Sequence, residues 1–150
     1  MKNSFRLTVT AAVVFLVLIS AALAAVTLPK HSTVTTARTG LGTVVADGSG
    51  RTLYLFEKDT TMRSACSGTC AVYWPPLLTR GGPVAVKGVQ RSLLGTIRRA
   101  DGTRQVTYAR HPLYRFSGDT RRGQTNGEGL RDLGAGWYAL TPSGKKIDRD

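Results

Sequence analysis

Cysteine is scarce in this chain of 150 residues, which contains only two. Two thiolates cannot build a disulfide scaffold or complete a four-thiolate zinc site by themselves. The hydrophobic fraction of 41% is ordinary and charged residues make up 20%, which excludes a wholly disordered chain and a polytopic membrane protein. The length allows one domain at most.

The motifs of common enzymes are also missing. The sequence contains no G-x-S-x-G nucleophile elbow, no H-E-x-x-H zinc pair and no P-loop. Its two histidines are His31, in a polar segment, and His111, which precedes a proline. We therefore expect a protein without enzymatic activity and without a cofactor.

A basic start followed by an apolar run marks the amino terminus as an export signal. Lys2 and Arg6 precede the uncharged residues 7–28, and Ala22-Leu23-Ala24 has the small residues that signal peptidase recognises. The run is close to the roughly 20 residues that a membrane span needs, so an uncleaved anchor is the alternative to cleavage after Ala24, which we favour. Either way, the chain beyond leader 1–24 is extracytoplasmic, secreted or anchored to the outer face of the cytoplasmic membrane.

Charge of one sign dominates the chain, whose net charge is +12 and would be +10 after cleavage. The electrostatic field of such a positive charge attracts anionic envelope polymers or lipid head groups. The basic residues are scattered in pairs such as Arg98-Arg99 and Arg121-Arg122, without a nucleic-acid motif. We expect no specific nucleic-acid partner.

The leader is followed by a polar segment and then by regularly spaced turn signals. Residues 25–40 are rich in Thr and Ser and predict a flexible spacer before a domain at 41–150. Asp47-Gly48-Ser49-Gly50, Asp101-Gly102 and Ser143-Gly144 each separate runs of β-favouring residues. This pattern predicts a mainly β domain, a small antiparallel sheet, sandwich or barrel. At most one or two short helices are expected besides the leader, one of them between Ser67 and Trp74.

A segment of eight residues recurs sixty positions later. Residues 53–60 read LYLFEKDT and residues 113–120 read LYRFSGDT. Each copy is followed by a loop and then a tryptophan, Trp74 or Trp137. The repetition predicts two similar halves, at about 42–78 and 89–144.

Alternation along a strand separates the two faces of this repeated segment. Leu55 is replaced by Arg115 in the second copy, whereas the aromatic positions are kept. The comparison assigns four aromatic residues to the core, namely Tyr54, Phe56, Tyr114 and Phe116. A buried tyrosine hydroxyl needs a partner, which Asp59 or Asp119 could supply, although an Asp at a strand exit also fixes a turn.

Both copies resemble the Yx(F/W/Y)xxD motif of a family of predicted lipoproteins, the secreted repeat of unknown function. The resemblance extends over roughly residues 42–144 and includes Cys66-Ser67-Gly68-Thr69-Cys70, Trp74-Pro75-Pro76 and Gly136-Trp137-Tyr138. The chain departs from the family in lacking a lipoprotein cysteine. It also carries Ala109-Arg110 where members often have Asn-Gly in a tight turn. The resemblance implies an exported bacterial envelope protein of unestablished activity, and it supplies no catalytic residue.

Cys66 and Cys70 are expected to pair, because thiols four positions apart in an oxidising compartment form a disulfide when the chain bends enough. Such a bond would hold one loop in shape. The alternative is a redox or copper-handling protein in which Cys66, Cys70 and His111 bind the metal.

One carboxylate pair is a further candidate. Asp59 and Asp119 would meet if the two halves packed about a pseudo-twofold axis, and they could then bind a cation or share a proton. We favour the structural role for both. The sequence as a whole predicts a binding or structural domain of the cell envelope, with a redox or copper-handling protein as the alternative.

Overall fold

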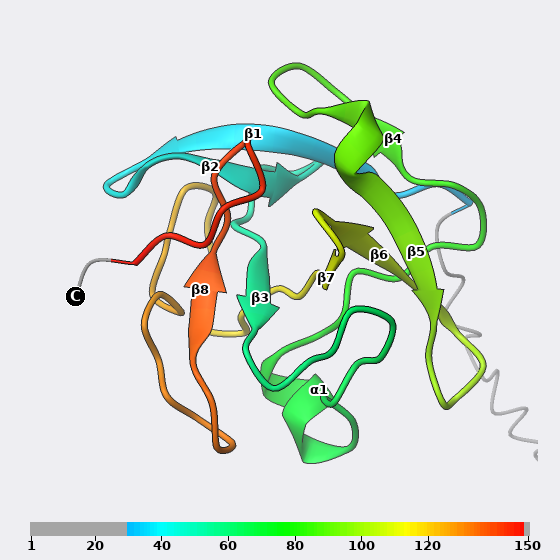
Figure 1. Cartoon of the computed structure of the whole chain (residues 1–150). Helices are drawn as coiled ribbons and strands as arrows, with labels where there is room; N and C mark the ends of the chain where they lie inside the picture. Colours follow the sequence, from blue (N-terminus) through cyan, green and yellow to red (C-terminus); the bar gives the residue numbers. More distant parts are fainter. Residues whose placement is uncertain (1–29, 149–150) are drawn as a thin grey trace, which may run out of the picture.

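The computed structural model describes residues 30–148, so the predicted leader lies outside the described residues (Figure 1). In chain order the elements are β1 (Thr33–Thr39), β2 (Gly42–Asp47), β3 (Tyr54–Phe56), α1 (Thr69–Tyr73), β4 (Val84–Ala85), the 3-10 turn η1 (Arg91–Leu93), β5 (Leu94–Arg98), β6 (Arg104–Tyr108), β7 (His111–Pro112) and β8 (Trp137–Ala139). The predicted mainly β fold with a short helix is confirmed.

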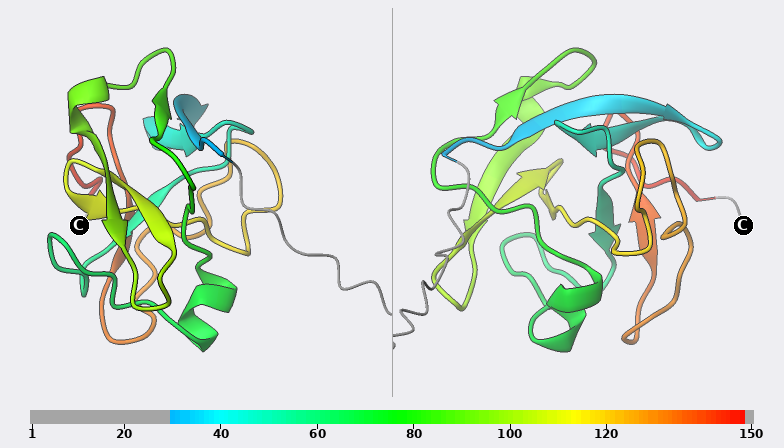
Figure 2. Two further views of the ribbon diagram at one scale, coloured as in Figure 1. Left: turned by 90° about the vertical axis from the view of Figure 1, so that its right-hand side faces the viewer. Right: turned by 180° about the vertical axis from the view of Figure 1, so that it is seen from behind.

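The strands form three small sheets. β1 lies between β2 and β4, β6 lies between β5 and β7, and β3 pairs with β8. All of these pairings are antiparallel except that of β1 with β4. Seen from behind, β3 and β8 lie side by side below the long β1 strand (Figure 2). Because β3 comes from the first half and β8 from the second, this sheet joins the halves.

The two halves repeat the same backbone hydrogen bonds. In the first half, Val45 N–H donates to Leu140 O (2.8 Å) and Leu53 N–H to Val45 O (3.0 Å). In the second, Val106 N–H donates to Leu77 O (2.9 Å) and Leu113 N–H to Val106 O (3.0 Å). Val45 and Val106 are therefore equivalent positions: each donates to a carbonyl of the other half and accepts from an N–H of its own half.

The prediction of a spacer through residue 40 is wrong for residues 33–39, which form β1. β1 pairs with β2 from Val34 opposite Asp47 to Thr39 opposite Gly42. Val34 is completely buried. Threonine is β-branched and favours extended backbone, so a Thr-rich segment with one apolar anchor is a strand as readily as a linker. The folded domain therefore begins several residues before position 41.

Each of the three turn signals lies where the chain reverses. Asp101-Gly102 joins β5 to β6, and Ser143-Gly144 lies within a reversal closed by the bridge between Leu140 and Lys146. At the signal that begins with Asp47, the end of β2 and the segment leading into β3 share a single bridge, between Ala46 and Thr52, and then separate. The predicted helix is α1, and Pro75 follows its carboxyl end.

The alternation of the repeated segment divides the core into two clusters. Leu53 and Leu55 lie in an aliphatic cluster, whereas Tyr54 and Phe56 lie in an aromatic cluster. Phe116 is the least buried of the four motif aromatics and packs at the edge of the aromatic cluster. The predicted separation of the two faces is confirmed.

Candidate functional site

The two copies of the motif meet at their tyrosines. Tyr54 N–H donates to Tyr114 O at 2.8 Å, and Tyr114 N–H donates to Tyr54 O at 3.0 Å. This isolated antiparallel bridge places the same residue of both copies face to face. The halves are thus related by a pseudo-twofold axis that passes between the tyrosines.

Each tyrosine hydroxyl bonds to the aspartate of the other half. Tyr54 Oη donates to Asp119 Oδ2 at 2.6 Å, and Tyr114 Oη donates to Asp59 Oδ2 at 2.8 Å. Burial, together with the carboxylate in each pair, raises the pKa of both hydroxyls above the usual range of tyrosine, so both remain donors. We call these two bonds the Tyr–Asp exchange.

Each carboxylate also fixes its own loop. Asp59 Oδ1 accepts from Ala65 N–H at 2.7 Å, and Asp119 Oδ1 accepts from Asn126 N–H at 2.9 Å. Asp59 and Asp119 therefore have separate tyrosine and backbone donors. The structure gives no pairing of the two carboxylates with each other.

The aromatic rings also pack against rings of the other half. The rings of Trp74 and Trp137 are stacked at 3.8 Å between centroids and 4° between planes. Phe56 stacks on Trp137 at 4.0 Å, and Phe116 lies over Trp74 at 4.4 Å. The result is a four-ring column in which each phenylalanine packs against the tryptophan of the other half. The column contributes area burial and specific ring packing to the contact between halves.

The two ends of the Tyr–Asp exchange differ in access to solvent. Asp119 is completely buried, whereas Asp59 is half-buried and lines a hollow of about 400 Å³ with Thr60, Thr61 and His111 among its other walls. Burial raises the pKa of Asp59 to about 6, and burial lowers the pKa of His111. Both oxygens of Asp59 accept protein hydrogen bonds, and the other polar residues that line the hollow are Thr60, Thr61, Arg110 and His111.

The cysteines form the Cys66–Cys70 disulfide, with Cα atoms 5.2 Å apart. The bond closes the loop that leads into α1, and both cysteines are buried beside Trp74 in the aromatic cluster. Within residues 30–148, no three His, Cys, Asp or Glu side chains are grouped so that they could hold a metal ion. The structure thus does not bring His111 together with the cysteines as a ligand set.

Arg99 is a site residue that the sequence analysis missed. Its guanidinium is buried and donates to Ser64 Oγ, Gln105 Oε1 and Cys66 O, each at 2.7 Å. The Ser64 hydroxyl in turn donates to Tyr114 Oη, 2.7 Å away, because the one proton of Tyr114 Oη is given to Asp59. A single buried cation therefore connects the β5–β6 turn to the disulfide loop and to the Tyr–Asp exchange. No sequence signal distinguished Arg99 from the exposed Arg98 beside it.

Asp47 and Arg115 form an ion pair that the sequence analysis also missed, with Oδ2 and Nε 2.6 Å apart. Ser49 N–H and Arg51 N–H also donate to Asp47 Oδ1, at 2.9 and 3.1 Å. The donors and the guanidinium of Arg115 outweigh burial and hold the pKa of Asp47 below its usual range. The replacement of Leu55 by Arg115 was the available signal, because a charge at a core-facing position needs a partner.

A family model described as a secreted repeat of unknown function matches the chain twice, over residues 35–78 and 95–141. The chain belongs to this family. The two matches coincide with the two structural halves, and the resemblance inferred from the motif is confirmed. Membership in a family of secreted repeats makes the protein extracytoplasmic.

The other comparisons add no relative. Neither the curated proteins nor the solved structures contain a match to the chain. Among residues 30–148, no helix has the length and apolarity that a membrane span requires.

Proposed function

We propose that this secreted repeat protein is a binding module of the cell envelope that holds anionic envelope polymers by its cationic surface and catalyses no reaction. The Tyr–Asp exchange supports this proposal, because the tyrosines and aspartates of the family motif serve there to join the two halves. Tyr54 and Asp119 are buried, and Asp59 has protein donors on both oxygens. A partner would therefore meet other residues, on the outer surface.

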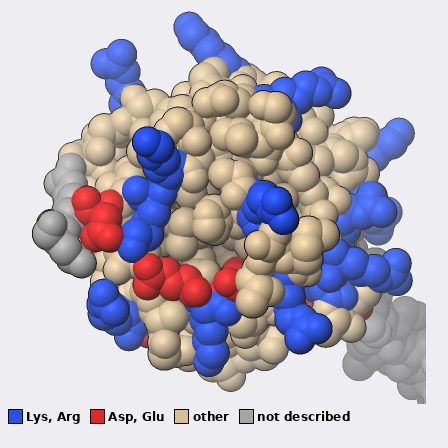
Figure 3. All heavy atoms as spheres, viewed as in Figure 1, with Lys and Arg blue, Asp and Glu red and all other residues tan. Residues whose placement is uncertain are grey.

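The outer surface is strongly cationic. Lys and Arg side chains project from the top, the right side and the lower edge of the molecule in this view, whereas Asp and Glu occupy a few places (Figure 3). Several carboxylates are engaged with protein groups, as Glu57 is with Lys146 at 2.9 Å. Each such pair removes one charge of either sign, so the excess of 21 Lys and Arg over 9 Asp and Glu leaves exposed guanidinium and ammonium groups, whose electrostatic field attracts polyanions over about 10 Å in 0.1 M salt.

The alternative, a redox or copper-handling role of Cys66 and Cys70, has less support. Cys66 has no exposed surface, and Cys70 is 9% exposed. Thiol exchange and metal capture need an accessible thiolate. The contacts of the loop with Trp74 and Arg99 favour a structural role for the disulfide.

Retention on isolated cell walls tests the proposal. The exported protein is mixed with wall fragments and eluted at about 0.05 M and at about 0.5 M sodium chloride. Screening should weaken retention at least tenfold if several phosphate or carboxylate groups are bound. Walls stripped of their anionic polymers provide the control and should retain little protein. Retention that is independent of salt contradicts the proposal, and binding to anionic lipid vesicles alone would identify head groups as the partner instead.

A further inference from the structure

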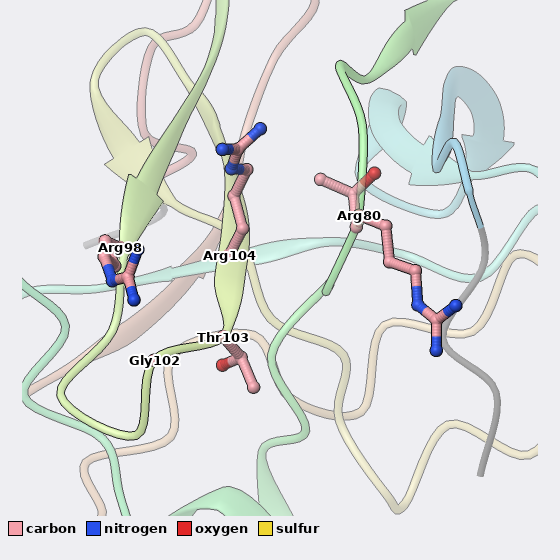
Figure 4. A pocket seen from close by; sticks show the side chains of 6 residues that line it. Arg80, Arg98, Gly102, Thr103 and Arg104 are labelled. Carbon is pink, nitrogen blue, oxygen red and sulfur yellow. The ribbon is translucent and has the colours of Figure 1, made fainter.

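Three arginines from neighbouring chain segments line one hollow on the second half. Arg98 ends β5 and lies opposite Arg104, the first residue of β6. The chain leading to Arg80 runs along the other side of β6, because Thr79 N–H donates to Arg104 O at 2.9 Å. The hollow has a volume of about 350 Å³, and its walls include Thr103 and Gly102 at the turn (Figure 4). We call it the three-arginine hollow.

The three guanidinium groups have no protein partner. Arg80, Arg98 and Arg104 are exposed, and among residues 30–148 none of their side chains forms a hydrogen bond or ion pair. The nearest carboxylate along the chain, Asp101, is already engaged: its Oδ1 accepts from Thr103 N–H and Oγ, and its Oδ2 lies 3.6 Å from Arg99. The hollow is therefore lined by donors that lack acceptors.

The Arg98–Arg104 pair is unfavourable for the fold. Like charges directly opposite each other on antiparallel strands destabilise a sheet. The first half shows that the fold does not need the second arginine. Since Val45 and Val106 are equivalent, Thr43 corresponds to Arg104, and its cross-strand partner is Arg38. The equivalent pair is thus one arginine and one threonine.

Arg98 also lines a second hollow, of about 520 Å³, on its other side. Arg63, Ser64 and Met62 are among the walls of that hollow. Two concavities that share one arginine form an extended basic surface, which suits consecutive groups of a linear chain better than a single ion or a flat bilayer.

We propose that the three-arginine hollow binds the phosphate groups of a linear, phosphate-containing polymer. Arginine presents a planar fork that bonds two phosphate oxygens at once, whereas lysine acts as a point charge. Arg98 and Arg104 would share one phosphate, which removes their mutual repulsion, and Arg80 or Arg63 would contact the neighbouring groups. This inference rests on the proposed function and assigns its site and ligand chemistry.

Three single substitutions in the exported protein test the site, with long-chain inorganic polyphosphate as the probe. Arg104→Thr copies the first half, so it should fold with an unchanged or slightly higher Tm and bind polyphosphate about tenfold more weakly. Arg38→Thr removes one arginine from the equivalent cross-strand pair of the first half, where Arg38 corresponds to Arg98, and should change binding less than about threefold. Arg104→Lys keeps the charge but lacks the planar guanidinium fork, so it should bind polyphosphate several-fold more weakly than the unmodified protein.

The outcomes separate this inference from the proposed function. Equal losses in Arg104→Thr and Arg38→Thr would overturn the site, while salt-sensitive retention on walls would still support the proposed function. Full binding by Arg104→Lys, or equal affinity for polyphosphate and a polyglutamate of the same charge, would overturn the assignment to phosphate. Binding to phosphatidylglycerol vesicles but not to polyphosphate would overturn the polymer as ligand. If retention on walls does not respond to salt, both the proposed function and this inference are contradicted.

Discussion

Asp119 has no exposed surface, and its carboxylate accepts one bond from Tyr54 Oη and one from Asn126 N–H. Tyr54 Oη in turn accepts from Gly127 N–H at 3.3 Å. Tyr54→Phe would leave a buried carboxylate and a backbone donor each short of a partner. We expect the free energy of unfolding to fall by about 1.5–3 kcal/mol, measured by urea denaturation.

Tyr114→Phe provides the matched control for this prediction. Its partner Asp59 is half-buried, so water can replace the lost hydroxyl, and the loss of stability should be smaller than for Tyr54→Phe. A double-mutant cycle of Tyr54→Phe with Asp119→Asn should show coupling of at least about 0.5 kcal/mol. Additive effects would contradict a direct contribution of the Tyr54–Asp119 bond.

Asp59 makes the stability depend on pH in an uncommon direction. Burial raises its pKa to about 6, above the value of about 3.9 in an unfolded chain. Between these values the folded state binds more proton than the unfolded state, so the contribution of Asp59 to stability decreases as pH rises from about 4 to 6. Asp59→Asn should abolish this slope. The measurement is urea unfolding of both proteins at pH 4, 5, 6 and 7, and a difference between them that is constant over pH would contradict the prediction.

At the scale of single residues, the sequence predicts which side chains belong to the site better than it predicts their hydrogen-bond partners. The duplication identified Tyr54, Tyr114 and both aspartates, and it placed the aromatic residues in the core. It could not show that each tyrosine bonds to the aspartate of the other half, because spacing within one copy is compatible with either partner. Arg99 was missed for a related reason: burial of its guanidinium depends on acceptors from two separate segments, the loop at Ser64 and Cys66 and strand β6 at Gln105.

At the scale of the elements, the turn between β6 and β7 carries backbone strain. Ala109 and Arg110 have φ values of 47° and 71°, the left-handed region that a two-residue hairpin turn requires and that Asn-Gly adopts easily. Arg110 is exposed. Arg110→Gly should therefore stabilise the protein by about 0.5–1 kcal/mol. This is the steric cost of a side chain at φ > 0, which glycine avoids, minus the extra conformational entropy that glycine loses on folding. Thermal unfolding followed by circular dichroism measures the change.

Arg110→Ala is the control for the turn, since it removes the same side chain but keeps a Cβ in the strained conformation. It should not raise the melting temperature. If Arg110→Gly and Arg110→Ala stabilise the protein equally, relief of charge rather than of backbone strain would be the cause.

The elements also show which local signals are reliable. Asp101-Gly102 predicted the β5–β6 hairpin and Pro75 the end of α1, because turn and helix-stop preferences act over a few residues. β1 was missed because its residues, mostly threonine, suit both a linker and an exposed strand. The decision depends on β2, which follows β1 after a short turn, and on β4, which lies far along the chain at Val84–Ala85; the two strands flank β1 in the sheet.

At the scale of the whole molecule, the halves are joined by strand pairing, by side-chain hydrogen bonds and by ring packing. The β3–β8 sheet, the Tyr–Asp exchange and the four-ring column each contain residues from both halves. The duplication predicted two similar units but not that neither unit completes its own core. Leu53, for example, packs in the same aliphatic cluster as Leu113, from the corresponding position of the second half. Such interlocking makes the halves one cooperative folding unit.

A divided chain tests this cooperativity. The exposed Gly88 lies in the connection between the halves, so one fragment can end there and a second can begin at Val89. Each fragment alone should lack a cooperative thermal transition, because it would expose half of the aromatic column. Mixing them under oxidising conditions should restore the fold and the near-ultraviolet circular dichroism of the stacked Trp74 and Trp137, since each fragment carries one tryptophan. A fragment that melts cooperatively by itself would show that a half is an independent domain, and the exchanged contacts would then join two folded units rather than create one.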